Sequence, residues 1–245
     1  MSCQIIMTMN KRDVGSLPLF QTPQGANAPF PDFPFDAKSV PDFQFENYLH
    51  AQGFNSIAGT DEAGRGPLAG PVVAAAVILP LGAQIEGLND SKKLSIAKRN
   101  ILFDVVMDVA LSVAVTSISA ETIDRTDIRK ASLEAMRRSI MRLGVLPDFV
   151  LADGRDIPPA LPSHMPAKAL VKGDGRSMTI AAAAIVAKVT RDRMMAQIGL
   201  ENEGYGLEKH MGYGSAQHRA KIENKGGITR IHRFSFRPLR KDDLS

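Results

Sequence analysis

A nearly continuous apolar run at residues 70–79, rich in Val and Ala, constrains the fold of this chain most. A run without polar alternation is typical of a strand that is buried on both faces of a sheet. Shorter apolar segments alternate along the chain with longer segments that have helical spacing. The predicted strands are residues 56–60, 70–79, 111–118, 148–153 and 169–172, and the predicted helices are residues 96–110, 126–143 and 178–198. This alternation predicts one α/β domain in which helices cover a central sheet.

The N-terminal segment differs from this core in composition. Residues 1–45 hold six prolines and have no helical or strand period. Proline lacks a backbone N–H and fixes φ, so this segment cannot join a regular ladder. We predict a flexible N-terminal extension over residues 1–45. In an alternative interpretation, its phenylalanines fasten parts of it to the domain: Phe30, Phe33, Phe35 and Phe43.

The C-terminal segment is basic. Residues 201–245 carry nine basic and six acidic side chains, together with His210, His218 and His232. Short helical pieces flanked by glycines predict an appended helical subdomain here. A basic surface suits phosphate groups, although a solvated face explains such a run equally well.

Cysteine usage and hydropathy indicate the compartment. Cys3 is the only cysteine, so neither a disulfide framework nor a thiolate zinc site can be built. The N-terminus lacks the apolar core and small-residue cleavage site of a secretory signal. The most apolar stretches, residues 72–81 and 180–187, are too short to span a bilayer. We therefore expect a cytoplasmic protein.

Four carboxylates stand at the ends of predicted elements. Asp61 and Glu62 directly follow the first predicted strand, Asp153 ends the fourth, and Asp174 opens the long helix. Each alone has an ordinary explanation, such as a helix cap at Asp174 or a turn at Asp153. Together they lie outside the strand ends, where α/β proteins have their active sites. If the strands are neighbours, the four side chains converge on one small area.

Crowded carboxylates indicate a metal site. They repel one another, and a bound divalent cation removes that repulsion. Carboxylate oxygens without Cys or His partners suit hard ions such as Mg²⁺ or Mn²⁺ rather than zinc. Two such ions about 3.5–4 Å apart can stabilise the attacking water and the leaving oxygen of a phosphodiester, which points to a nuclease. A glycosidase with two carboxylates is the alternative, which the absence of Trp and the presence of only three Tyr disfavour.

A glycine-rich turn, Gly64-Arg65-Gly66, follows the first two acids. Its glycines allow the backbone to approach a ligand closely, and arginine offers forked donors to a phosphate. The spacing matches neither a dinucleotide-binding fingerprint nor a P-loop. Beside an acidic metal site, the turn suits a sugar-phosphate backbone.

These residues resemble the bacterial ribonuclease HII family, the type 2 ribonucleases H. The resemblance covers roughly residues 55–238 and is specific, because many blocks recur in order at compatible spacing. The matching blocks are GTDEAGRGPLAGPVV at residues 59–73, NDSKKL at 89–94, ADG at 152–154, VKGD at 171–174, AKVTRD at 187–192, GYG at 212–214 and HRFSF at 232–236.

The resemblance implies the ribonuclease H-like α/β fold, with a central mixed sheet flanked by helices and a C-terminal helical subdomain. Residues 46–200 form the catalytic domain on this interpretation, and residues 201–245 form a basic region that contacts substrate. The resemblance also implies that four acids are catalytic and bind divalent metal, Mn²⁺ or Mg²⁺, with two ions when substrate is bound: Asp61, Glu62, Asp153 and Asp174.

The implied substrate is an RNA–DNA hybrid or duplex DNA that contains a ribonucleotide. Gly64, Arg65 and Gly66 match the turn that senses the 2′-hydroxyl, the group that separates the two sugars, and Tyr213 matches a tyrosine that packs against the next sugar at the RNA-to-DNA junction. The expected cut lies on the 5′ side of a ribonucleotide, even a single one, and leaves 3′-hydroxyl and 5′-phosphate ends. Several basic side chains, each equally explained as a surface charge, are expected to contact phosphates: Lys92, Lys93, Lys172, Lys188 and Arg191.

Two positions depart from the family pattern. Ala184 stands where the family has a serine, and residues 155–157 after the third acid differ from the usual asparagine-containing version. An alanine-rich helix face is also simply good packing and good helix propensity. Both departures leave the four acids, the turn and Tyr213 intact.

Two other functions stay open. A non-catalytic hybrid-binding module would explain the basic C-terminus and the glycine-rich turn, but a pure binder has no reason to crowd acids near phosphates. A junction resolvase or a 3′–5′ exonuclease on the same fold would have no 2′-hydroxyl to read. No sequence feature indicates a dimer interface or a clamp-binding peptide, so we expect a monomer.

Overall fold

The computed structural model describes residues 30–35 and 40–240. Its centre is a five-stranded sheet in the order β3-β2-β1-β4-β5. The strands are β1 (Ile57–Ala63), β2 (Val72–Ile78), β3 (Ser112–Ile118), β4 (Phe149–Asp153) and β5 (Ala167–Leu170). β2 pairs antiparallel with β1 and β3, whereas β4 pairs parallel with β1 and β5. The expected α/β fold with a central mixed sheet is therefore confirmed.

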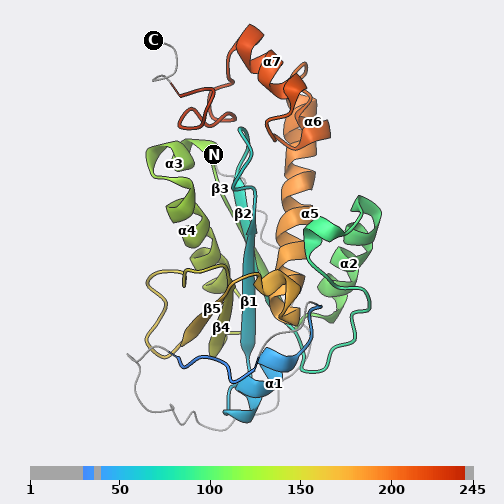
Figure 1. The fold of residues 1–245 in the computed structure, drawn as a ribbon, viewed down its shortest axis with the longest axis vertical. Helices are drawn as coiled ribbons and strands as arrows, with labels where there is room; N and C mark the ends of the chain where they lie inside the picture. The colour runs from blue at the N-terminus through green and yellow to red at the C-terminus, as the bar shows by residue number, and fades with distance from the viewer. Residues whose placement is uncertain (1–29, 36–39, 241–245) are drawn as a thin grey trace.

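Helices cover both faces of the sheet (Figure 1). α4 (Ile128–Ile140) packs on one face, and α5 (Met178–Glu201), flanked by α2 (Ile96–Val109), packs on the other. All seven residues of β2 are buried, because this strand is central and covered on both sides. The small side chains of Ala181, Ala182 and Ala183 are buried where α5 meets the sheet, which allows a close approach.

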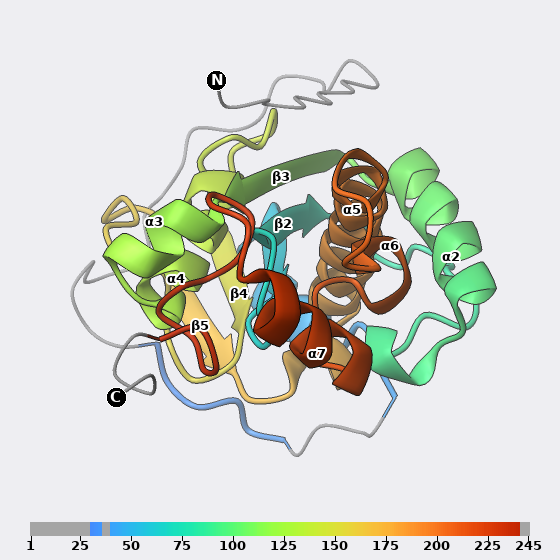
Figure 2. The ribbon, with the colours of Figure 1, turned by 90° about the horizontal axis from the view of Figure 1, so that it is seen from above.

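The remaining elements are short. They are α1 (Gln44–Ala51), α3 (Ala120–Arg125), α6 (Leu207–His210), α7 (Ala216–Lys225) and the 3₁₀ turns η1 (Ser91–Lys93) and η2 (Gly173–Gly175). Seen from above, α6 and α7 lie over one end of the sheet, as a helical C-terminal region (Figure 2). Among the described residues, we find no helix that combines the length and hydrophobicity of a membrane span.

The structure corrects several predicted boundaries. β1 continues through both of its acids to Ala63, because its last residues pair with β2. The helix expected at residues 126–143 is α4, which is shorter at both ends because Asp127 caps its start and Met141 its end. The short helix α3 before it, which Ser119 caps, was not predicted. Asp174 lies in η2 and precedes the long helix instead of opening it.

Residues 30–35, here called the N-terminal strap, pack on the domain. The ring centroids of Phe30 and Phe149 are 4.7 Å apart, and those of Phe33 and Phe45 are also 4.7 Å apart. Phe35 joins the same apolar cluster. These contacts match the interpretation in which phenylalanines fasten the segment to the domain. The flexibility expected for the rest of the extension concerns residues 1–29 and 36–39, which lie outside the described residues.

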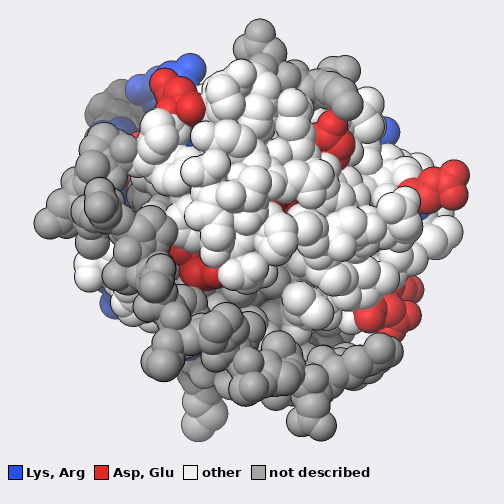
Figure 3. Space-filling view, turned by 90° about the horizontal axis from the view of Figure 1, so that it is seen from below, with Lys and Arg blue, Asp and Glu red and all other residues white. Residues whose placement is uncertain are grey.

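At the end of the molecule that carries α1, the described residues contribute little positive charge. Lys168 is neutralised there by the strap, because it donates hydrogen bonds to Asp32 and to the carbonyl oxygen of Phe30. In the view from below, few of the visible described side chains are Lys or Arg (Figure 3). The described part of this face therefore offers little attraction to a phosphate backbone.

Candidate active site

The register of the sheet places two of the predicted acids side by side. Thr60 of β1 pairs with Ala152 of β4 in a parallel ladder. The residues that follow, Asp61 and Asp153, are therefore neighbours, and their side chains point to the same face of the sheet.

The start of α5 brings a third acid to the same face. Gly59 lies against the backbone of Thr179, and a Cβ at Gly59 would collide with it. Side chains alternate along a strand, so Asp61 faces the same side as Gly59, towards the start of α5. Because α5 can approach β1 this closely, Asp174 in the preceding η2 turn comes near the acids of the sheet.

The electrostatics show that the four acids share one area. Burial, followed by the charges of Glu62, Asp153 and Asp174, raises the pKa of Asp61 well above its usual value. Burial also raises the pKa of Glu62 to about 7, although Arg65 acts in the opposite direction. The pKa values of Asp153 and Asp174 are raised mainly by burial, and the charge of Asp153 adds to the shift at Asp174. The structure therefore brings the four predicted acids together.

Two exposed cationic side chains lie beside these acids. Arg65 donates a hydrogen bond of 3.1 Å to Oε1 of Glu62, and Nζ of Lys92 lies 3.7 Å from Oδ2 of Asp174. Burial lowers the pKa of Lys92, but the charges of Asp174 and Asp61 outweigh burial and the net shift is upward. The Arg65 and Lys92 side chains are 54% and 82% exposed, so both can leave the acids without disturbing the core.

Backbone groups orient the acids on the sheet. Oδ1 of Asp153 accepts a 2.7 Å hydrogen bond from the N–H of Gly173, and Oδ1 of Asp61 accepts one of 2.6 Å from the N–H of Glu62. An all-carboxylate donor set fits a hard divalent ion. Within the described residues, however, no three His, Cys, Asp or Glu side chains are arranged around a point that could hold a metal ion. The acids converge without forming a closed coordination shell.

The glycine-arginine-glycine turn lies beside Tyr213. A Cβ on Gly66 would be 4.0 Å from Cε1 of Tyr213. The tyrosine is 45% exposed, and Nζ of Lys188 lies 5.8 Å from its ring centroid. The turn and the ring together form an exposed surface with a cation next to it.

Two buried arginines support this surface, and their role was missed in the sequence. Arg191 and Arg233 are both 0% exposed. Burial, followed by the charge of Arg191, lowers the pKa of Arg233 to about 9. The carbonyl oxygens of Gly64, Arg65 and Gly70 accept hydrogen bonds from Arg233, and those of Ala69, Pro71 and Met211 accept them from Arg191. Gly64, with φ of 100°, leaves room for the Arg191 side chain.

The other expected phosphate contacts differ in exposure. Lys92, Lys93 and Lys172 are exposed and Lys188 is partly exposed, so these side chains are accessible to a phosphate. The expectation for Arg191 is wrong, because its guanidinium is buried and bound to carbonyl groups. Ala184 is 2% exposed in the middle of α5.

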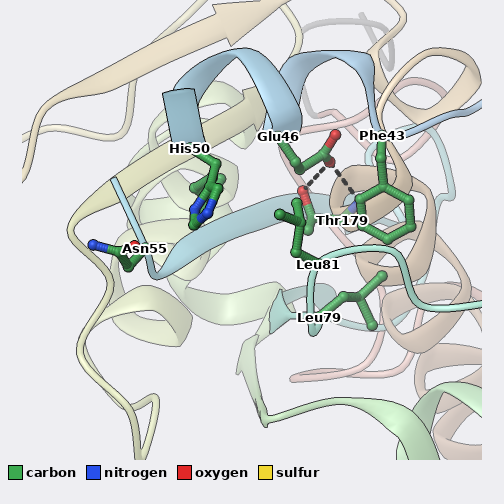
Figure 4. Close-up of a pocket in the computed structure, with 8 residues that line it drawn as sticks. Phe43, Glu46, His50, Asn55, Leu79, Leu81 and Thr179 are labelled. Carbon is green, nitrogen blue, oxygen red and sulfur yellow. Dashed lines mark hydrogen bonds between the residues drawn. The ribbon is translucent and has the colours of Figure 1, made fainter. Parts of the chain in front are cut away.

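A carboxylate from α1 holds the start of α5 (Figure 4). No sequence pattern predicted this contact. Oε1 of Glu46 accepts hydrogen bonds from the N–H and hydroxyl of Thr179 at 3.0 and 2.8 Å. It also accepts one of 2.7 Å from the hydroxyl of Ser177. Burial raises the pKa of Glu46. The cavity that it lines with Phe43 and His50 has a volume of about 50 Å³, which is too small for a substrate.

Comparisons with known proteins agree with this architecture. A family model described as Ribonuclease HII matches residues 58–238. The chain is 57% identical over 212 residues to the Ribonuclease HII of Bartonella bacilliformis, and the alignment covers 86% of this chain and 95% of that protein. The ribonuclease H2 structure from Pyrococcus horikoshii OT3 is similar with a TM-score of 0.65 at 26% identity, covering 77% of this chain and 97% of that one.

A more distant structure shares the fold alone. Bst-RNase HIII, solved in complex with Mn²⁺, has a TM-score of 0.58 at 20% identity and covers 77% of this chain and 69% of its own. The family match extends from β1 to beyond Tyr213 and so includes the four acids and the glycine-rich turn. The chain therefore belongs to the ribonuclease HII family, and it is a ribonuclease H that degrades the RNA of RNA–DNA hybrids.

Proposed function

We propose that this chain, besides cutting longer hybrids, nicks duplex DNA on the 5′ side of a single embedded ribonucleotide. The observation that carries the proposal is the position of the four acids next to a turn and a ring that can contact one sugar. A role in removing ribonucleotides during DNA replication and repair follows from that activity.

Asp61, Glu62, Asp153 and Asp174 are assigned the catalytic role and the binding of Mg²⁺ or Mn²⁺. Their oxygen donors and their raised pKa values support this, because a divalent cation relieves the repulsion. Two bound ions would stabilise the charge on the attacking water and on the leaving oxygen. The Mn²⁺ complex of Bst-RNase HIII agrees with such a requirement.

The remaining roles belong to the turn and Tyr213. Gly64, Arg65 and Gly66 contact the 2′-hydroxyl, and Tyr213 packs against the sugar that follows it, since Gly66 and the tyrosine ring are adjacent. Water attacks the phosphorus on the 5′ side of the ribonucleotide. The bond from phosphorus to the 3′-oxygen breaks, that oxygen takes a proton, and the 5′-phosphate stays on the ribonucleotide.

The setting of the enzyme is part of the same proposal. We assign it to the cytoplasm on the basis of its single cysteine. We assign it as a monomer because no sequence feature indicates a dimer interface. Residues 1–45 are the extension, residues 46–200 the catalytic domain and residues 201–245 the basic substrate-contacting region.

The test is cleavage of a DNA duplex that contains one ribonucleotide, incubated with Mg²⁺ or Mn²⁺ and, as control, with a chelator. The expected product is a metal-dependent nick 5′ to the ribonucleotide, with ends that DNA ligase can seal. Cutting of long hybrids without this nick would refute the roles of the turn and Tyr213. Binding without any product would favour the non-catalytic module.

A further inference from the structure

Two buried histidines connect the C-terminal segment to Tyr213. His218 in α7 is 0% exposed and His232 is 1% exposed. Their Nε2 atoms are 3.1 Å apart, and the ring of His210 stacks on His218 with a centroid distance of 4.3 Å. These rings are not a metal site, since no described group of three such side chains is arranged to hold an ion.

Backbone partners at both ends determine which ring nitrogens carry hydrogen. Nδ1 of His232 lies 2.9 Å from the N–H of Ile228, which can only donate, so this nitrogen is the acceptor. Nδ1 of His218 lies 2.9 Å from the carbonyl oxygen of Tyr213, which can only accept, so this nitrogen carries a hydrogen.

The hydrogen bond between the two rings then runs from His232 as donor to His218 as acceptor. A neutral His232 carries its hydrogen on Nε2, and a neutral His218 has a bare Nε2 that accepts it. The hydrogen bonds run from Ile228 through His232 and His218 to Tyr213, with every nitrogen satisfied. A second proton on either ring would bring two N–H groups face to face or would displace a backbone donor.

The surroundings favour the neutral forms. Burial, followed by the charge of His218, lowers the pKa of His232 to about 4, and burial lowers that of His218. The other titratable rings against the pair are His210 on His218 and Tyr205, whose centroid is 5.1 Å from that of His232. Among the described residues, no carboxylate forms a hydrogen bond with His218 or His232 that would stabilise an imidazolium.

We propose that His218 and His232 are positioning residues that hold Tyr213 against the glycine-rich turn and so set recognition of the ribonucleotide junction. The proposal rests on the function proposed for Tyr213. The carbonyl oxygen of Tyr213 accepts a hydrogen bond from Nδ1 of His218, and the backbone N–H of Tyr213 donates one to the carbonyl oxygen of His210. The ring leaves this fixed backbone towards Gly66.

The first test does not depend on catalysis. Long-range ¹H–¹⁵N correlation spectra of the full chain at pH 7.5 report the tautomer of each histidine. We expect a hydrogen on Nε2 of His232 and on Nδ1 of His218, with both rings neutral. We call the hydrogen bonds from Ile228 through His232 and His218 to Tyr213 the histidine relay. The opposite tautomer at either ring, or a charged ring, would refute this relay even if the nuclease function holds.

The second test is kinetic and uses the single-ribonucleotide duplex with Mg²⁺. His218→Phe removes both nitrogens. We expect KM to rise by about tenfold or more with a smaller change in kcat, because the tyrosine ring packs against the sugar and takes no part in the bond that breaks. His218→Asn, whose amide can replace the Nδ1–H donor, should recover part of the loss. His164→Phe is the matched control, because it makes the same change at an exposed histidine between β4 and β5, and it should retain the parent KM.

A double variant separates positioning from general destabilisation. If the relay acts through the tyrosine ring, adding His218→Phe to Tyr213→Ala should cost nothing further in kcat/KM, whereas independent effects multiply. Multiplied losses would refute the proposal, and so would a parent-like KM in a folded His218→Phe. A parent chain that makes no nick would refute the proposed function, while the spectra would still decide the relay.

Discussion

Arg233 donates a 2.6 Å hydrogen bond from Nη2 to the carbonyl oxygen of Gly64, a residue 169 positions earlier in the chain. The same guanidinium holds the carbonyl oxygens of Arg65 and Gly70. The glycine-rich turn is therefore shaped from inside the protein by a fork of donors, which a lysine ammonium cannot reproduce.

Arg233→Lys should misplace the turn. We expect kcat/KM on a single-ribonucleotide duplex to fall by about 10²-fold, because the turn is displaced from the reacting sugar. The melting temperature should fall as well, since buried carbonyl groups lose donors. Arg219→Lys is the control, because Arg219 is exposed and donates to the carbonyl oxygen of Gly214. Parent-like cleavage by Arg233→Lys would contradict this role.

Loss of one acid should abolish cleavage and relieve repulsion. Asp153→Asn and Asp174→Asn are expected to show no metal-dependent product in gel assays, with an unchanged circular dichroism spectrum. Without divalent ions their melting temperatures should rise, because crowded carboxylates destabilise the fold. Asp156→Asn is the control, since Asp156 pairs with Arg129. Full activity in both acid variants would remove these residues from the mechanism.

The metal-free enzyme should lose stability as the pH rises from about 4.5 to about 7. The pKa of Glu62 is raised from 4.5 to about 7, mainly by burial, so the folded protein binds this proton more tightly than the unfolded chain does. Its contribution is therefore complete below pH 4.5 and is lost as the pH passes 7. A shift of this size changes the free energy of unfolding by on the order of 3 kcal/mol between the two ends of this pH range. Thermal melts with chelator should show the decrease, and Glu62→Gln should reduce it. An equal decrease in the parent and in Glu62→Gln would show that groups other than Glu62 cause it.

The ring of Tyr213, more than its hydroxyl, should matter for cleavage. Tyr213→Phe keeps the packing surface, so we expect it to retain much of the activity on a junction-containing duplex. Tyr213→Ala removes that surface and should lose most of the activity. Steady-state rates on a single-ribonucleotide duplex check both, and an alanine variant as fast as the parent would remove Tyr213 from the site.

Glu46 should stabilise the start of α5 through its acceptor oxygen and not through its charge. Glu46→Gln keeps an acceptor for Ser177 and Thr179, so its free energy of unfolding should stay close to that of the parent. Glu46→Ala removes the acceptor of three buried donors, of which only one hydroxyl can donate to the other instead, and should cost about 3 kcal/mol. Denaturant unfolding of the two variants gives the comparison. Equal losses would show that the charge, not the acceptor, is what α5 requires.

The acids and the sheet could be predicted because their signals are local. Asp61 and Asp153 follow apolar strand segments directly, and the neighbouring strands of the sheet then bring them together. The boundaries were less accurate. A strand that continues through two acids contradicts the hydrophobic pattern, and only the pairing of β1 with β2 explains it.

The support beneath the site could not be predicted because it is non-local. Arg191, Arg233 and Glu46 are charged, and charged residues are rarely fully buried, so composition places them at the surface. Except for Met211, which lies 20 residues from Arg191, their partners lie more than 100 residues away in the sequence. No periodicity reports such contacts, and the same holds for the pairing of His218 with His232.

The packing of the N-terminal strap limits how far this chain can be shortened. The sequence alone suggests residue 46 as a natural starting point for a minimal enzyme. A chain that begins there would leave Phe54 and Phe149 without Phe30, whose ring packs against both. Exposed apolar surface of this kind promotes aggregation. The solubility of a truncated enzyme should therefore depend on whether it begins before or after residue 30.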